Sequence, residues 1–251
     1  MRCLSRLLLL GICGLLASCI DGREEYWLAA DGSGRAEIHY EIPAVIAKGC
    51  GGEAGISKLL DTFVRETPTL TNASHQVTSH TDRLMVDFHA SFQSALAAVA
   101  ALRGDSALSA GNFKPVVEPL IGQFDIHHGG LNVELTRTVS PSKALPGSFL
   151  MPASQFDGRR LVYILHLPVA ARESNATRTA DGGRTLIWDQ TLQESLKHSI
   201  LIHFKATLPP PWGKIAGVGA LLVAAAWLGL RARRRRQDGR GSRPLVRVDG
   251  V

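Results

Sequence analysis

The 251-residue sequence lacks the paired cysteines on which disulfide-rich exported domains depend. It has four cysteines, and three of them, Cys3, Cys13 and Cys19, lie in the first 19 residues. If that segment is processed or lipid-modified, Cys50 is left alone, and a single cysteine cannot close an internal disulfide. Its glycine-rich setting, KGCGGEAG, indicates an unpaired thiol in a loop rather than an activated nucleophile. A small disulfide scaffold is therefore excluded.

Motifs for metal, nucleotide and nucleophile chemistry are also missing. The sequence contains no HExxH, no paired CxxC, no Walker loop and no GxSxG. One weak alternative combines Ser106 in a GDS triplet with Asp125 and His128, as in an esterase class where serine attacks and histidine takes its proton. That class places its serine after an early parallel strand, whereas Ser106 is expected to follow a helix. The main reading has no catalytic residue, metal or cofactor.

The central part of the chain lacks the basic excess of a nucleic-acid-binding protein. The formal net charge is +6, but residues 231–251 hold eight arginines and two aspartates. Residues 20–213 hold 17 basic and 20 acidic residues, a net charge of −3. Basic side chains therefore concentrate next to apolar segments, which is typical of membrane topology signals, and no nucleic-acid partner is expected.

An apolar run near the N-terminus is typical of a signal peptide. Residues 7–16 follow Arg2 and Arg6 and are too few to cross a bilayer, which takes roughly 20 apolar residues. The following LASC, residues 16–19, matches the cleavage box of bacterial lipoproteins at all four positions. The sequence predicts a signal peptide over 1–18 and a lipid on Cys19. An ordinary secretory signal with a chance cysteine is the alternative.

A second apolar run near the C-terminus predicts a transmembrane helix over 209–230. Residues 215–230 carry no charge, and five arginines follow between 231 and 236. By the positive-inside rule the tail 231–251 faces the cytoplasm and residues 19–208 form an extracytoplasmic domain on the cytoplasmic membrane. A cleaved sorting signal is the alternative, but LPPPWG does not match the LPxTG motif.

The pattern of apolar residues predicts one α+β domain, a mainly antiparallel sheet with two helices. One helix carries an apolar stripe from Ile56 to Val64 and ends at Thr67-Pro68. The other is expected to start at a Ser91 cap and to carry Phe92. Alternating or apolar segments predict strands at 25–30, 35–42, 84–90, 160–168, 184–188 and 199–208, and a hairpin over 124–139 that turns at Gly129-Gly130.

Three positions between residues 170 and 190 have specific expectations. Asn175 is expected to adopt a left-handed turn conformation, and Asp181-Gly182-Gly183 to make a tight reversal. Trp188 alternates with its neighbours along a strand, which favours a place in the core over a ligand-stacking role.

The predicted elements come in the order of a lipobox, a strand, the turn DGSG, a strand, a helix, a strand, a helix and a hairpin. The segment LVYILHLPVAARESNATRTADGGRTLIWDQTL then follows. This order resembles that of the LppM-type lipoprotein domain family. The resemblance covers most of residues 19–230, and such domains tend to precede one C-terminal span. It implies an α+β extracytoplasmic domain that is not an enzyme and that binds a membrane lipid or glycolipid. It provides no motif from which ligand residues can be named, and the segment 140–158 reads as this protein's own elaboration. A protein-docking subunit of an envelope complex is the alternative function.

Overall fold

The computed structural model describes residues 20–103, 114–145, 148 and 156–209. The chain divides into two units, Met1–Pro209 and Pro210–Val251, and the fold below belongs to the first. The predicted signal peptide, Cys19, the basic tail and, apart from Pro209, the predicted span 209–230 lie outside the described residues. Within the described residues, no helix has both the length and the apolar character needed to cross a bilayer.

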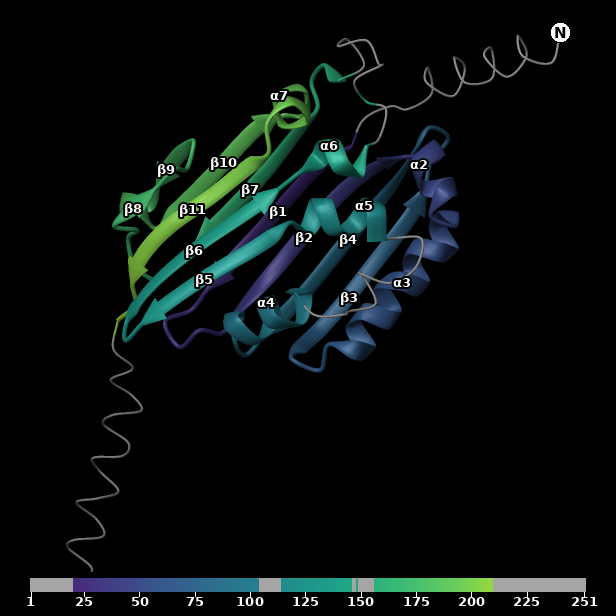
Figure 1. Ribbon diagram of the computed structural model, residues 1–251. Helices are drawn as coiled ribbons and strands as arrows, with labels where there is room; N and C mark the ends of the chain where they lie inside the picture. The colour runs from purple at the N-terminus through teal and green to yellow at the C-terminus, as the bar shows by residue number, and fades with distance from the viewer. Residues whose placement is uncertain (1–19, 104–113, 146–147, 149–155, 210–251) are drawn as a thin grey trace, which may run out of the picture. The chain divides into compact units, whose positions relative to one another are not determined.

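The larger of two sheets has seven strands in the order β3-β4-β2-β1-β7-β10-β9 (Figure 1). Its neighbours are antiparallel except for β1 and β7, which are parallel. The apolar segment 160–168 therefore lies inside the sheet, as predicted. The strands are β1 (Asp21–Leu28), β2 (Gly34–Pro43), β3 (Leu70–Ser79), β4 (Arg83–Phe92), β7 (Arg160–His166), β9 (Arg178–Ala180) and β10 (Thr185–Thr191).

The smaller sheet has four antiparallel strands in the order β5-β6-β11-β8. The predicted hairpin is confirmed, although Gly129 pairs with Asn132, so the turn falls at Gly130-Leu131. Its inner face packs on β7 and β10, where Trp188 and Phe204 share one buried cluster. The strands are β5 (Gln123–Gly129), β6 (Asn132–Val139), β8 (Glu173–Ser174) and β11 (Ile200–Thr207).

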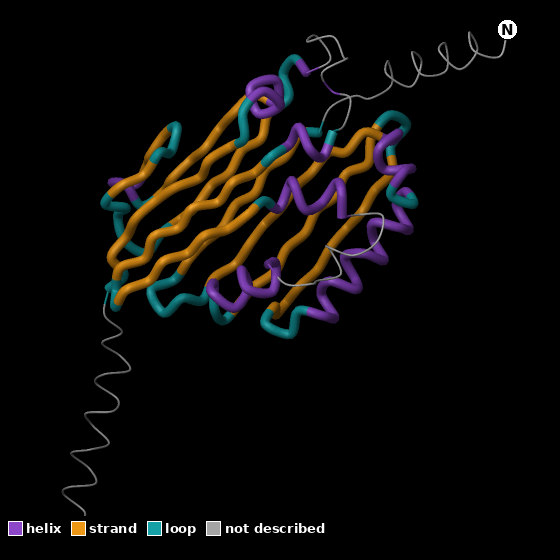
Figure 2. The backbone as a smooth tube through the Cα atoms, in the orientation of Figure 1, coloured by secondary structure: helices purple, strands orange, loops and turns teal. Residues whose placement is uncertain are grey.

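Six α-helices occur in the described part of the chain, against two predicted. Figure 2 shows helices over the half of the larger sheet that contains β2, β4 and β3, while the smaller sheet lies over the other half. The helices are α2 (Ala44–Gly49), α3 (Gly52–Glu66), α4 (Ala95–Arg103), α5 (Lys114–Ile121), α6 (Pro141–Ala144) and α7 (Leu192–Lys197), with a 3₁₀ turn η5 (Asp181–Gly183).

The helix predicted from Ile56 is confirmed as α3, and the expected start of the second helix is wrong. Phe92 still belongs to β4, because its side chain continues the buried inner-face alternation of that strand. The helix α4 starts only at Ala95, where Ser94 Oγ accepts a hydrogen bond from the N–H of Ala97 at 3.3 Å. Ser94, not Ser91, therefore caps the first turn.

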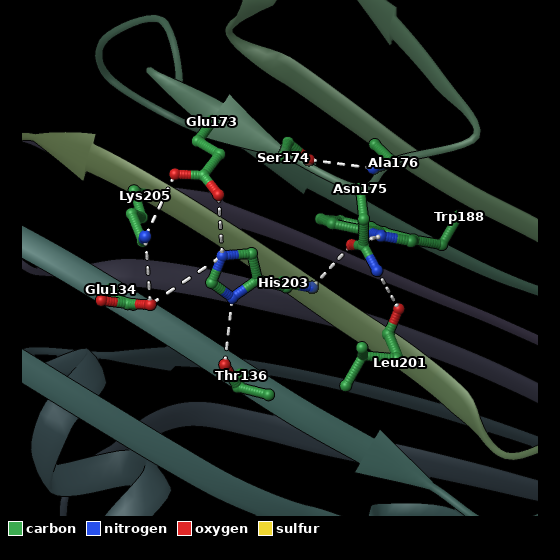
Figure 3. A network of polar contacts seen from close by, with 10 residues as sticks. All are labelled: Glu134, Thr136, Glu173, Ser174, Asn175, Ala176, Trp188, Leu201, His203 and Lys205. Atoms are coloured by element: carbon green, nitrogen blue, oxygen red, sulfur yellow. Dashed lines mark hydrogen bonds and ion pairs between the residues drawn. The ribbon is translucent and has the colours of Figure 1, made fainter.

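Asn175 joins the two sheets instead of making a left-handed turn. Among the described non-glycine residues, only Asn72 and Asp181 have positive φ. The Asn175 carboxamide oxygen accepts from Trp188 Nε1 and from the backbone N–H of His203, both at 2.8 Å (Figure 3). Its Nδ2 donates to the carbonyl oxygen of Leu201 at 2.8 Å. Trp188 is only 2% exposed, which confirms its predicted place in the core.

Candidate functional site

The inner faces of both sheets and the helices α2 to α5 line a partly open cavity of about 330 Å³. Period-two alternation turns Ile38, Tyr40 and Ile42 of β2 toward it. The cross-strand neighbours Ala36 and Ala90 also belong to its wall, and their small side chains leave room that a larger residue would occupy. The volume falls within the range of roughly 300–1,000 Å³ that is usual for small-molecule sites.

Aliphatic and aromatic side chains make up most of the cavity wall. The helix α3 contributes one apolar stripe, and α4, which has a single charged residue at its end, contributes alanine, valine and leucine side chains. Such a surface offers dispersion contacts and no solvation for a charged ligand group. Its lining includes Leu28, Ile56, Leu59, Leu60, Phe63, Val86, Phe88, Phe92, Ala98, Val99, Leu102, Leu120, Phe124, Leu135 and Ile202.

Two charged residues also line the cavity, and they neutralise each other. Arg137 Nη1 lies 2.6 Å from Glu24 Oε2, and Arg137 Nη2 lies 3.1 Å from Glu24 Oε1. Both side chains are about 5% exposed, so the pair is shielded from water. The bidentate geometry matches the planar guanidinium to both carboxylate oxygens. The pair joins β1 of the larger sheet to β6 of the smaller one.

Two phenols complete the coordination of Glu24. Tyr40 donates to Oε1 at 2.6 Å and Tyr26 donates to Oε2 at 2.7 Å. Burial would raise the pKa of Glu24, but the Arg137 charge and the donated hydrogen bonds hold it below its ordinary value. Burial, and then the Glu24 charge, raise the pKa of Tyr26 and of Tyr40 well above their ordinary value. All three groups therefore keep one protonation state across neutral pH.

Arg137 is also tied to the end of α5. Its Nε donates to the carbonyl oxygen of Ile121 at 2.7 Å, and Nη2 donates to that of Leu120 at 3.2 Å. The guanidinium carbon lies 5.1 Å from the ring centres of both Phe124 and Tyr163. Arg137 thus connects both sheets and a helix, and its donors are largely occupied by the protein itself.

Cys50 has a different environment from the flexible loop expected for it. It follows α2, is 8% exposed and packs with Ala47, Ile56, Leu84 and Val86. Burial raises the pKa of its thiol above the ordinary value. A buried thiol of this kind is a weak nucleophile, and it also lines the cavity.

The two described residues of the esterase alternative, Asp125 and His128, are not brought together. Asp125 and His128 lie on β5, three positions apart, so they point to opposite faces of the strand. Asp125 instead contacts the exposed His127, whose Nε2 lies 3.1 Å from Asp125 Oδ2. Ser106 lies outside the described residues, as does the predicted lipid attachment site Cys19. The described residues contain no group of three or more His, Cys, Asp or Glu side chains arranged to hold a metal ion.

Sequence reasoning did not identify Glu24 and Arg137, although the signal was present. Glu24 falls between Gly22 and Tyr26 on the inner face of β1, and Arg137 falls between Leu135 and Val139 on the inner face of β6. A charged residue at an inward position of an otherwise apolar face requires a partner, because an unpaired buried charge is very costly.

No family model and no curated protein matches this chain. Among solved structures, it is similar to the folded domain of LppM from Mycobacterium tuberculosis, which was determined by NMR. The TM-score is 0.49 and the sequence identity is 14%, over 78% of this chain and 93% of that one. The similarity is one of fold, and no ligand or activity follows from it.

Proposed function

We propose that this protein is a non-enzymatic envelope lipoprotein whose domain holds a hydrocarbon chain of a membrane lipid or glycolipid in its cavity. The observation that carries the proposal is the apolar cavity of about 330 Å³, which is partly open to solvent. An apolar cavity of about 150 Å³ already stays dry and binds a molecule such as benzene. A space twice as large, lined by aliphatic and aromatic side chains, suits part of an acyl or isoprenoid chain.

The electrostatics of the wall favour a neutral occupant. Glu24 and Arg137 compensate each other, and the carboxylate already accepts hydrogen bonds from two phenols. A second charge placed beside them would be desolvated without a partner. A charged headgroup therefore stays outside, while the chain fills the interior.

Lipid extraction followed by mass spectrometry of the purified full chain tests this proposal. We expect a lipid in near-stoichiometric amount from the unaltered protein. The substitution Ala36→Phe or Ala90→Phe places a ring in the cavity, so each variant should release most of that lipid. Ala180→Phe, on the exposed strand β9, is the matched control and should retain it. Equal lipid in all four proteins would refute binding in the cavity, and absence of lipid from all of them would favour the protein-docking alternative.

The proposed placement has two attachments to the cytoplasmic membrane, a lipid on Cys19 and a helix over 209–230. The lipobox and the five arginines after the apolar run support it. A reporter enzyme fused after Val251 should be active in the cytoplasm. Activity only outside the cytoplasm would reverse the orientation and reject this topology.

A further inference from the structure

The chain enters the domain at one end of the strands and leaves it at the other. In the larger sheet, Gly22 at the start of β1 pairs with Leu161, next to Arg160, which pairs with Thr191 at the end of β10. The helix α7 then leads into β11, whose eight residues run back to Thr207 (Figure 1). At about 3.3 Å per residue, entry and exit are separated by roughly 25 Å.

Little free chain separates the domain from its two predicted anchors. Ile20, next to Cys19, is 1% exposed and belongs to the core between the sheets. At the exit, the backbone N–H of Leu208 donates to the carbonyl oxygen of Leu131 at 2.8 Å. If both anchors of the proposed function hold, both ends of the strands are kept close to one bilayer surface. The strands then lie along that surface, and one long side of the domain faces the headgroups.

The two long sides of the domain differ in charge. Residues 20–158 hold 10 basic and 16 acidic residues, a net charge of −6, whereas residues 159–207 hold 7 basic and 4 acidic residues, a net charge of +3. The second segment contains β7 to β11. Its short strands β8 and β9 are edge strands of the smaller and the larger sheet, respectively. The helix α3 lies at the opposite, β3 side (Figure 1).

The carboxylates on the β8–β9 side are already engaged within the domain. Glu173 pairs with Lys205 at 3.1 Å, and Asp189 pairs with Arg160 at 2.6 Å. Glu194 closes the capping box of α7, and Asp181 accepts the hydroxyl of Thr185.

Four exposed cations remain along this side: Arg172, Arg178, Arg184 and Lys197. We call them the basic edge. Of the four, Arg178 has a carboxylate contact, Asp189 at 3.5 Å, and it is 66% exposed. They extend from α7, near the entry of the chain, to the residues before β8, near its exit.

We propose that the basic edge contacts anionic lipid headgroups, with the strands lying along the membrane surface and α3 directed away from it. Cations near an anionic leaflet are attracted within about a Debye length, roughly 10 Å at 0.1 M salt. The negative charge of the remaining domain opposes the reverse orientation. The contact uses residues outside the cavity wall, so it can be separated from chain binding by mutation.

Fluorescence quenching of the full chain in vesicles tests this contact. The protein, in a Cys50→Ser background, carries a fluorophore on a cysteine at Thr179 of β9 or at Lys58 of α3. The vesicles contain phosphatidylcholine, phosphatidylglycerol and a lipid with a quencher on its headgroup. We expect several-fold stronger quenching at Thr179 than at Lys58. The difference should shrink when phosphatidylglycerol is omitted or when salt is raised to 0.5 M, because screening shortens the range of the attraction to a few ångströms.

Charge reversal provides the matched comparison. The triple variant Arg172→Glu, Arg178→Glu, Arg184→Glu should lower quenching at Thr179 to the level seen at Lys58. A second triple variant, on the α3 side, makes the same change in net charge and should leave quenching at Thr179 high. It carries Lys48→Glu, Lys58→Glu and Arg65→Glu. Equal quenching at both positions, or equal effects of both triple variants, would overturn the proposed orientation.

Measurements on the same purified proteins, made before they are placed in vesicles, separate this proposal from the proposed function. The mass of the N-terminal peptide reports whether Cys19 carries lipid, and extraction reports whether the cavity holds a chain. Loss of bound lipid with selective quenching at Thr179 would reject chain binding and keep the basic edge. Bound lipid without selective quenching at Thr179 would keep chain binding and reject the basic edge as the membrane contact.

Discussion

Glu24 and Arg137 stand 113 positions apart in the chain and form a bidentate ion pair between the two sheets, with a shortest N–O distance of 2.6 Å. Removal of one partner leaves a buried charge without compensation. We expect Glu24→Gln or Arg137→Met to lower the free energy of unfolding by about 3–5 kcal/mol. The double variant Glu24→Leu, Arg137→Met should lose much less than the sum, because no charge is left behind. Urea unfolding measures each value.

The exposed pair Glu173 and Lys205 is the control for that experiment. Its side chains are 60% and 40% exposed, so water screens the pair and Glu173→Gln should cost far less than Glu24→Gln. If Glu24→Gln lowered the free energy of unfolding as little as Glu173→Gln does, water would reach the buried pair. The interpretation of the cavity wall as neutral and dry would then be wrong.

The same cluster predicts a stability plateau bounded on both sides by pH. The pKa of Glu24 is held below its ordinary value of 4.5, so the unfolded chain takes up the proton first and stability falls as the pH drops below about 4.5. The pKa values of Tyr26 and Tyr40 lie above the ordinary 10.0, so the unfolded chain loses protons first and stability falls above about pH 10. Thermal midpoints between pH 3 and pH 11 measure both limbs. The Tyr26→Phe, Tyr40→Phe variant should lose part of the alkaline limb, because burial also raises the pKa of Tyr163 and of the Cys50 thiol. An unchanged limb would assign it to those two groups.

Local periodicity was enough to predict the elements that carry a clear apolar pattern. The stripe from Ile56 to Val64 predicted α3, and the alternation of Ile38, Tyr40 and Ile42 predicted the face of β2 that lines the cavity. Strand β3 was missed because LTNASHQVTS is polar at most positions and lies at the edge of the sheet. Its pairing with β4, rather than its composition, makes it a strand.

Contacts between distant parts of the chain could not be read from the sequence. Gly22 pairs in parallel with Leu161, and most of the domain's chain lies between these two residues, so no local pattern indicates the pairing. Glu24 and Arg137 were not identified from the sequence, and their contact exists only because the two sheets stack. The cavity is likewise a result of packing, since it is lined by segments from β1 to β11.

Asn175 should matter for stability through its side chain rather than through its backbone conformation. Asn175→Ala removes the acceptor for Trp188 Nε1 and for the N–H of His203, and the donor to Leu201. We expect a loss of about 1–3 kcal/mol for the buried donor that is left unpaired, with a change in tryptophan fluorescence. Asn132→Ala, which removes one exposed hydrogen bond from Thr207, should have a smaller effect. Similar losses in both variants would mean that Asn175 does not join the sheets in solution.

Cys50 provides a native probe of the cavity. Because the thiol is buried and its pKa is raised, it should react slowly with a maleimide at pH 7 in the folded protein and rapidly after unfolding. Removal of bound lipid should speed the reaction in the folded state, since Cys50 lines the cavity. A cysteine placed at the exposed Lys58 should react at one rate before and after lipid removal. An unchanged rate at Cys50 would place the lipid elsewhere.

Cys19→Ala tests why a chain with a transmembrane helix would also carry a lipid. A single acyl chain holds weakly and a spanning helix is effectively permanent, so the variant should stay in the membrane as a precursor that keeps residues 1–18. The domain of this variant should lose its fixed orientation relative to the membrane, because only the Thr207 end of the strands then stays close to the bilayer. Quenching at Thr179 by headgroup quenchers should therefore fall well below that of the lipidated protein, while the Ala90→Phe cavity variant keeps full quenching. A second tether raises the local concentration of the basic edge at the surface without a new contact. Equal incorporation of labelled fatty acid by Cys19→Ala and the unaltered chain would show that the lipid is attached elsewhere.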